Sequence, residues 1–158
     1  AYSYNDRALR AQGSNGDLLR FDQARNLSSY FVDFIFKYRG FAFYTDFMGR
    51  TCTSSPLIKS GETVEQYILT GMGLNVQASY LFPSNWEIAL RNSTIKPDKE
   101  VQPYTNYRCY NQSTLGVTKY LIDHRLKVQA DLSYNYKDEF TASDYSRWQL
   151  RFQVELGF

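Results

Sequence analysis

The sequence predicts an all-β fold: an antiparallel sheet whose strands cross a membrane as part of a β-barrel. Three patterns predict this fold. Apolar and polar side chains alternate with a period of two, the alternating segments are longer than ordinary strands, and the links between them are alternately short and long. No stretch approaches the roughly 20 consecutive apolar residues that a membrane helix needs, so a helical membrane protein is excluded.

The composition fits this class and excludes others. The chain has 158 residues, about one domain, and 18 Lys and Arg against 16 Asp and Glu leave a net charge of +2. This balance does not predict a nucleic-acid partner. Aromatic residues make up 17% of the chain, which suits a barrel with aromatic girdles at both membrane interfaces.

The N-terminal part, residues 1–27, breaks the alternation and predicts a partial strand end followed by an extracellular loop. The chain starts at Ala1 without a signal peptide, so we expect a removed signal or a longer polypeptide. If Phe158 lies on the periplasmic side, only residues 1–4 remain to cross the membrane before this loop. At about 3.3 Å per residue they are too short. We therefore expect the C-terminal strands of a larger barrel, with a complete eight-stranded barrel as the alternative.

Residues 28–158 predict about seven membrane strands. Their lengths of roughly 10–14 residues exceed the usual 5–6 and suffice for a tilted crossing. The last strand is the clearest, because Leu150, Phe152 and Val154 alternate with Arg151 and Gln153. The alternating segments, in chain order, are 30–38, 41–50, 68–82, 86–91, 109–121, 125–137 and 147–158.

The links between these segments fall into two length classes. Tight turns are expected near 39–40, 83–85 and 122–124, and long polar links over 52–66, 97–108 and 138–146. Outer-membrane barrels keep their periplasmic turns short and their extracellular loops long, and a soluble meander has no reason to do so.

Charged side chains on the polar face of these strands are the candidates for a water-filled lumen. Both signs occur among them, so they predict a general pore rather than one selective ring. The candidate lumen residues are Asp33, Lys37, Asp46, Arg50, Glu87, Arg91, Arg125, Lys127, Asp131, Arg147, Arg151 and Glu155.

Aromatic side chains near the strand ends on the apolar face predict lipid-facing girdles. Ordinary β-propensity is the alternative explanation, but the position near strand ends favours girdles. The girdle candidates are Tyr30, Phe36, Tyr38, Phe41, Trp86, Tyr134, Tyr136, Trp148 and Phe158.

The cysteine and histidine residues do not predict a catalytic or metal-binding site. Cys52 and Cys109 lie outside any CxxC pair, and either a loop-to-loop disulfide or, preferably, two free thiols are expected. His124 lies in a turn without a nucleophile elbow, so it predicts a solvated residue and not a catalytic base. We expect no enzyme, no metal and no cofactor.

Several segments together resemble a known family. The stretches 38–43 (YRGFAF), 77–83 (QASYLFP), 86–91 (WEIALR), 114–117 (TLGV) and 126–134 (LKVQADLSY) occur in an order and spacing similar to the C-terminal half of the phosphate-selective porin O and P family. The resemblance covers about residues 28–158. It implies a sixteen-stranded, often trimeric barrel that conducts small solutes.

The final strand, which ends in Phe158, resembles the C-terminal signal that the barrel-assembly machinery recognises. The family's phosphate selectivity rests on an arginine ladder and a lysine cluster at an inward-folded loop, and no such loop can be matched here. The resemblance therefore implies a pore without proving anion selectivity.

The predicted function is passive diffusion of small hydrophilic solutes or ions, phosphate among the candidates, across the outer membrane of a Gram-negative bacterium. The expected partners are the lipid bilayer, the assembly machinery, and further copies in a homotrimer or subunits of an outer-membrane complex. One alternative is a non-conducting scaffold in such a complex. Another is a soluble, lipocalin-like barrel, in which the apolar faces would point inward.

Overall fold

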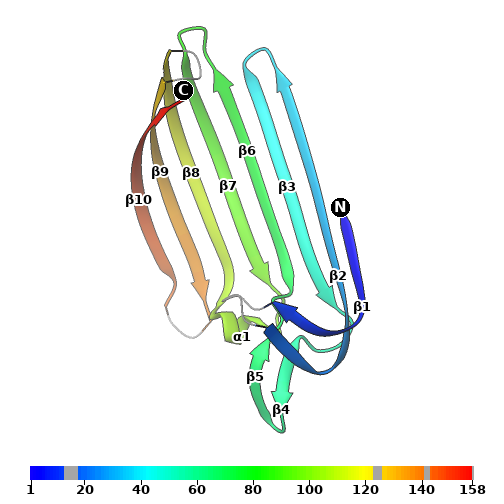
Figure 1. The fold of residues 1–158 in the computed structure, drawn as a ribbon. Helices are drawn as coiled ribbons and strands as arrows, with labels where there is room; N and C mark the ends of the chain where they lie inside the picture. The colour runs from blue at the N-terminus through cyan, green and yellow to red at the C-terminus, as the bar shows by residue number, and fades with distance from the viewer. Residues whose placement is uncertain (13–17, 123–125, 141–142, 158) are drawn as a thin grey trace.

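A computed structural model of the chain describes residues 1–12, 18–122, 126–140 and 143–157. Eight strands form one antiparallel sheet in the order β1-β2-β3-β6-β7-β8-β9-β10, and β4 and β5 form a separate hairpin (Figure 1). The elements are β1 (Tyr2–Gln12), β2 (Leu18–Tyr38), β3 (Phe41–Cys52), β4 (Leu57–Ser60), β5 (Thr63–Tyr67), β6 (Gly71–Leu81), β7 (Trp86–Pro97), α1 (Gln102–Thr105), β8 (Tyr107–Ile122), β9 (Leu126–Glu139) and β10 (Tyr145–Leu156).

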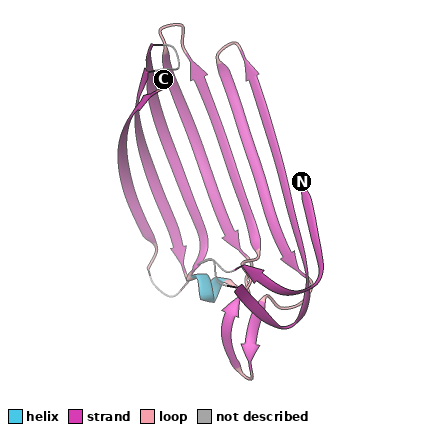
Figure 2. Ribbon diagram, viewed as in Figure 1, coloured by secondary structure: helices cyan, strands magenta, loops and turns pink. Residues whose placement is uncertain are grey.

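The all-β prediction is confirmed, and the sheet is open and curved (Figure 2). β1 and β10 are its two edges, and within the described residues no pairing joins them. No helix in the described parts of the chain is long and apolar enough to span a membrane.

Long uninterrupted ladders hold the sheet together. β9 and β10 pair over twelve consecutive positions, from Lys137↔Tyr145 to Leu126↔Leu156, without a register shift. β2 pairs with β3 in the same way from Leu27↔Cys52 to Tyr38↔Phe41. The alternation of apolar and polar side chains in β9 and β10 excludes a slip of one residue, because such a slip would move every side chain to the opposite face.

Two tight turns lie at the end of the sheet where β2 meets β3 and β6 meets β7 (Figure 1). Arg39 and Gly40 both have positive φ, 44° and 85°, the backbone that a two-residue hairpin turn of the right twist requires. Asn85, with φ 61°, serves the second turn. The turns predicted at 39–40 and 83–85 are thus present, while the turn predicted near 122–124 lies mostly outside the described residues.

The prediction of a loop over most of residues 1–27 is wrong. This region forms β1 and the first part of β2, which pair with each other from Tyr2↔Tyr30 to Gln12↔Leu18. Register shifts between Asn5 and Ala8 and between Ala8 and Arg10 interrupt the ladder. Such bulges insert extra residues and break the period of two, which is why the sequence pattern did not reveal a strand.

The opposite end of the sheet carries the long connections (Figure 2). A small apolar core lies there as well. The links predicted as loops contain the β4–β5 hairpin and the single turn of α1. Leu27 of β2 and Ile58 of β4 are buried together with Ala8 and Ile68. The buried Arg25 side chain donates from Nε to the Ser55 carbonyl at 2.9 Å and from Nη2 to the Leu57 carbonyl at 2.8 Å, so it holds the hairpin against β2.

Candidate functional site

The pairing register sorts the side chains of the sheet into two faces, since directly opposed residues lie on the same side. One row across seven strands is polar at every position. A second row, three residues further along β2, is apolar at every position. We name the two sides after these rows, the polar face from Asp33–Asp46–Asn75–Ser93–Gln112–Asn135–Arg147 and the apolar face from Phe36–Phe43–Ala78–Leu90–Leu115–Leu132–Leu150.

Eleven of the twelve candidate lumen residues lie on the polar face, and Arg125 lies outside the described residues. Eight of the nine girdle candidates lie on the apolar face, and Phe158 lies outside the described residues. The register therefore brings each set together on one side of the sheet. What each side faces is a separate question, which burial and charge address.

Burial is inverted relative to a water-soluble protein. On the apolar face of β10, Leu150, Phe152 and Val154 are 62%, 73% and 64% exposed. On the polar face, Asp131 is only 5% exposed, and Ser133 is also buried. Soluble proteins bury large apolar side chains and rarely bury a carboxylate, so the buried side chains of this sheet are of the opposite kind.

Hydrogen bonds across the strands pair many of the buried and partly buried polar groups of the polar face. Ser93 Oγ donates to Asn75 Oδ1 at 2.8 Å, and Asn75 Nδ2 donates to Asp46 Oδ2 at 2.9 Å, which links β7, β6 and β3. The hydroxyls of Thr114 and Ser133 lie 2.8 Å apart between β8 and β9. Each such bond removes the cost of a buried polar group without a partner.

A charged cluster joins β8, β9 and β10. Arg151 donates from Nε and Nη2 to one oxygen of Asp131 at 2.8 and 2.6 Å, and Gln129 donates to the other oxygen at 2.9 Å. Gly116 opposite leaves room for this carboxylate, because a Cβ there would lie 3.1 Å from Asp131 Oδ1. The arrangement is a charge-assisted pair between a buried carboxylate and a guanidinium whose side chain is 55% exposed.

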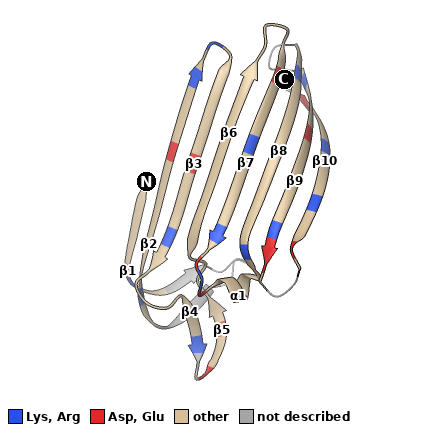
Figure 3. Cartoon of the chain, turned by 180° about the vertical axis from the view of Figure 1, so that it is seen from behind, with Lys and Arg blue, Asp and Glu red and all other residues tan. Residues whose placement is uncertain are grey.

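The remaining charges of the polar face are unevenly distributed (Figure 3). Asp33 and Asp46 oppose each other on β2 and β3. Arg91, Arg147 and the paired Arg151 lie on β7 and β10. The mixture neither forms a ring of one sign nor repeats along the strands, so the polar face has no selective charge ladder within the described residues.

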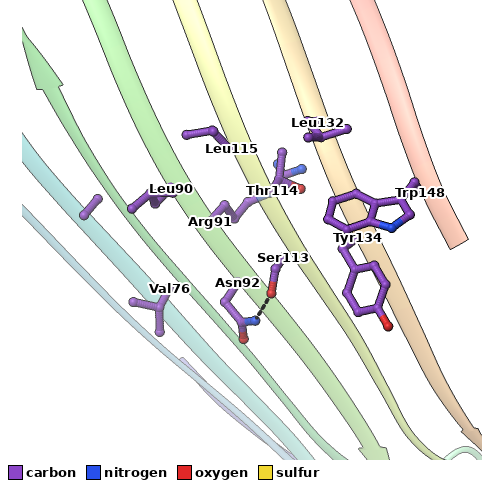
Figure 4. A pocket seen from close by; sticks show the side chains of 11 residues that line it. Val76, Leu90, Arg91, Asn92, Ser113, Thr114, Leu115, Leu132, Tyr134 and Trp148 are labelled. Carbon is purple, nitrogen blue, oxygen red and sulfur yellow. Dashed lines mark hydrogen bonds between the residues drawn. The ribbon is translucent and has the colours of Figure 1, made fainter. Parts of the chain in front are cut away.

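The apolar face is not uniform, and sequence reasoning missed the exception. Asn92, Thr94, Asn111 and Ser113 lie on this face and bond with one another, with Asn111 Nδ2 donating to Thr94 Oγ1 at 2.7 Å and Asn92 Nδ2 to Ser113 Oγ at 2.9 Å. The signal was available, because both parities turn polar at 92–94 and 111–113. Figure 4 shows Asn92 and Ser113 beside a shallow hollow of about 530 Å³ between Leu90, Tyr134 and other side chains.

The two cysteines are free thiols, which corrects the alternative of a disulfide between Cys52 and Cys109. Cys52 ends β3 and Cys109 lies near the start of β8, with β6 and β7 between them. Three strand spacings amount to about 14 Å, whereas a disulfide needs Cα atoms within about 7 Å. The topology therefore keeps the thiols apart.

Other reactive groups are scattered. His124 lies outside the described residues. In the described ranges, no group of three His, Cys, Asp or Glu side chains gathers in a way that could hold a metal ion.

Comparison with known proteins gives no identity to this arrangement: no protein-family model, no curated protein and no solved structure matches the chain.

Proposed function

We propose that the chain forms part of the wall of an outer-membrane β-barrel through which small hydrophilic solutes and ions diffuse passively. One observation carries the proposal. The apolar face exposes large apolar side chains on seven strands, while the side chains buried in the sheet are polar ones of the other face, chiefly on β8 and β9, where they are bonded across the strands. Lipid outside and water inside is the environment in which both faces are satisfied, since a bilayer supplies no partners for backbone or side-chain polar groups.

The size of the apolar face supports a lipid environment. Exposed large apolar side chains occur on β2, β3, β6, β7, β8, β9 and β10. A water-soluble monomer rarely exposes a continuous apolar patch beyond a few hundred Å². A face that continues across seven strands needs an apolar neighbour, and no helix or strand within the described residues covers it.

The border of the apolar face is oblique to the strands, as a tilted crossing requires. On β6 the apolar stretch includes Leu74, whose partner on β7 is the polar Thr94. The same face of β7 becomes apolar only at Leu90, which lies four residues closer to the tight-turn end than Thr94 and pairs with Ala78. On β7, the border nearest the long connections therefore lies closer to the tight-turn end of the sheet than it does on β6.

The other border moves in the same direction. On β3 the apolar face ends at Phe41, at the tight turn. The row through Phe41 reaches Ala130 on β9, and β9 stays apolar on this face for four more residues, to Leu126. Four residues span about 13 Å along a strand. A level membrane band crosses inclined strands in this way, and barrel strands are inclined by about 35–45°.

The two ends of the sheet indicate an orientation. The tight turns lie at one end, and the β4–β5 hairpin and α1 lie at the other (Figure 1). In an outer-membrane barrel the end with short turns faces the periplasm, and the end with long connections faces outward. The resemblance to the porin O and P family agrees with this reading and supplies the remainder of a sixteen-stranded barrel, which would pair the free edges of β1 and β10.

The mixed charges of the polar face favour a general pore over a phosphate-selective one. Six cations and five carboxylates of the predicted lumen set lie on this face, and two of the cations are paired across strands, Arg151 with Asp131 and Lys127 with Glu155. Selective pores align charges of one sign at a constriction. We therefore expect a weak preference between anions and cations.

Single-channel recording in planar bilayers tests the proposal with the full native polypeptide. Steady conductance that scales with salt concentration, with a reversal potential near zero in a salt gradient, is the expected result. Insertion into the bilayer without conductance would overturn the pore and leave a scaffold in an outer-membrane complex. Solubility without detergent would overturn the membrane assignment itself.

A further inference from the structure

The polar face is interrupted near the long-connection end by apolar side chains. Phe31 of β2, Met48 of β3 and Ile95 of β7 all point to this face and are exposed. Together with Leu69, which precedes β6, they line a cavity of about 270 Å³. Nothing in the proposed pore wall requires an apolar surface at this place, because the neighbouring positions on the same face are polar.

A glycine lies beneath the apolar lining. Gly73 lies between Met48 and Ile95 in the row across β3, β6 and β7. A Cβ at Gly73 would lie 3.0 Å from Cγ of Met48, so the Met48 side chain packs over the glycine. The glycine thus lets the Met48 side chain lie close to the sheet within the lining of the cavity.

Two polar groups meet this apolar lining. Arg50 lines the cavity, and its Nε donates to Ser29 Oγ at 3.0 Å, which restrains the guanidinium at the rim. Within the described chain no carboxylate lies within 4 Å of the Arg50 guanidinium, so its terminal amino groups are available to an anion. Thr70 also lines the cavity, is 2% exposed, and its hydroxyl has no hydrogen-bond partner among the described residues.

We infer that this cavity binds small organic anions with an apolar body, such as an aromatic monocarboxylate. A guanidinium pairs with a carboxylate through two parallel hydrogen bonds, and the apolar lining provides a favourable surface for a ring. The volume lies just below the range of drug-sized sites, which suits a small molecule and excludes a folded partner. Inorganic phosphate satisfies Arg50 alone and leaves Phe31, Met48 and Ile95 unused.

The binding site deepens the proposed function, and its role in transport rests on that function. In a pore, the site would bind an organic anion transiently on the polar face of the wall, near its extracellular end. Conduction requires that such binding be weak enough to release the solute. We therefore expect dissociation constants in the millimolar range, where one hydrogen-bonded ion pair and one buried ring suffice.

Methyl NMR on the detergent-solubilised full native polypeptide tests the site. The methyl groups of Met48 and Ile95 are the reporters, and the probes are benzoate, inorganic phosphate and benzyl alcohol. Benzoate is expected to shift both methyl signals saturably, with phosphate and benzyl alcohol each at least about tenfold weaker, since each lacks one half of the recognition.

Variants separate the two halves of the site. Arg50→Gln is expected to weaken benzoate binding about tenfold or more, and Ile95→Ser to weaken benzoate while leaving the weak phosphate response unchanged. Lys59→Gln is the matched control, because it removes one cation from β4, outside the cavity, and should change nothing.

Several results would overturn the inference. Shifts that never saturate, equal binding of benzoate and phosphate, or unchanged benzoate affinity in Arg50→Gln would each do so. Bilayer conductance without benzoate binding would contradict the proposed site and support the proposed pore. Saturable benzoate binding in a chain that conducts nothing would support the site and contradict the pore.

Discussion

The two ends of this molecule bury opposite kinds of side chain. At the long-connection end, Leu27, Ile58 and Val101 are buried, as in a water-soluble domain. Along the sheet, Leu150 and its apolar neighbours are exposed, and Asp131 is buried. The chain therefore buries apolar side chains at its long-connection end and polar side chains in the sheet. The change occurs at the border of the apolar face nearest the long connections.

The proposed function explains the contrast by two solvents, water at the loop end and lipid along the sheet. The hydrophobic effect drives apolar groups out of water only, so an apolar core is needed where water surrounds the chain. Where lipid surrounds it, apolar side chains gain nothing from mutual burial, and the polar groups must instead find partners. Under the proposed function, water surrounds the loop end and lipid surrounds the apolar face of the sheet, and the following changes test that division.

The largest effect is expected for Phe152→Arg, in the middle of the apolar stretch of β10. A cation facing lipid near the midplane costs about 2–4 kcal/mol of folding free energy. Gln153→Arg, the next residue on the opposite face, should cost little. Urea titration of the protein folded in lipid vesicles measures both. Equal costs at the two positions would contradict the assignment of the faces.

A comparable but local loss is expected for Ile58→Ala at the loop end. Removing buried methyl groups from the apolar core should destabilise the β4–β5 hairpin by about 2–4 kcal/mol and leave the sheet intact. Limited proteolysis would then cut within 52–70 while the strands stay protected. Lys59→Ala, at an exposed neighbour, is the control, and cooperative loss of the whole sheet in Ile58→Ala would show that the two regions are one unit.

A smaller effect is expected for Asp131→Asn on the polar face. The change weakens the two charge-assisted bonds from Arg151, so the free energy of unfolding in vesicles should fall by about 1–2 kcal/mol. Because the carboxylate is buried, high salt should reduce the loss only slightly. An unchanged unfolding midpoint would mean that water already satisfies Arg151.

The smallest effect is expected for Glu155→Gln, which breaks the pair with Lys127 at 3.0 Å. Half of the Glu155 side chain is exposed, so the pair should contribute about 0.5 kcal/mol or less, and salt should abolish it. The same vesicle unfolding assay measures it. A loss as large as that of Asp131→Asn would show that this end of the polar face is as dry as its centre.

The long strands of the sheet could be predicted from the sequence because each has one polar and one apolar face. Alternation in β9 and β10 runs through the ten paired positions from Asn135↔Arg147 to Leu126↔Leu156, and hydrophobicity differs at every step. The tight turn at Arg39 and Gly40 could also be predicted from the sequence, since Gly tolerates positive φ. The division of charged and aromatic residues between two faces followed from the same period.

The loop end could not be predicted in this way. β1 and the first part of β2 are strands with bulges, so their side chains do not alternate. The β4–β5 hairpin depends on contacts between segments far apart in sequence, such as the bonds from Arg25 to Ser55 and Leu57. The apolar cavity beside Arg50 was also hidden, because Phe31, Met48 and Ile95 meet only when three separate strands align.

In the proposed barrel, the cross-bonded rows of the polar face would help to fix the register in which the strands pair. A slip of one residue would turn Asp46 toward lipid, which disfavours that pairing. A slip of two residues keeps each face correct, and lipid cannot detect it. The bonds from Ser93 to Asn75 and from Asn75 to Asp46 supply the missing check, because they form only when three strands stop at the same step.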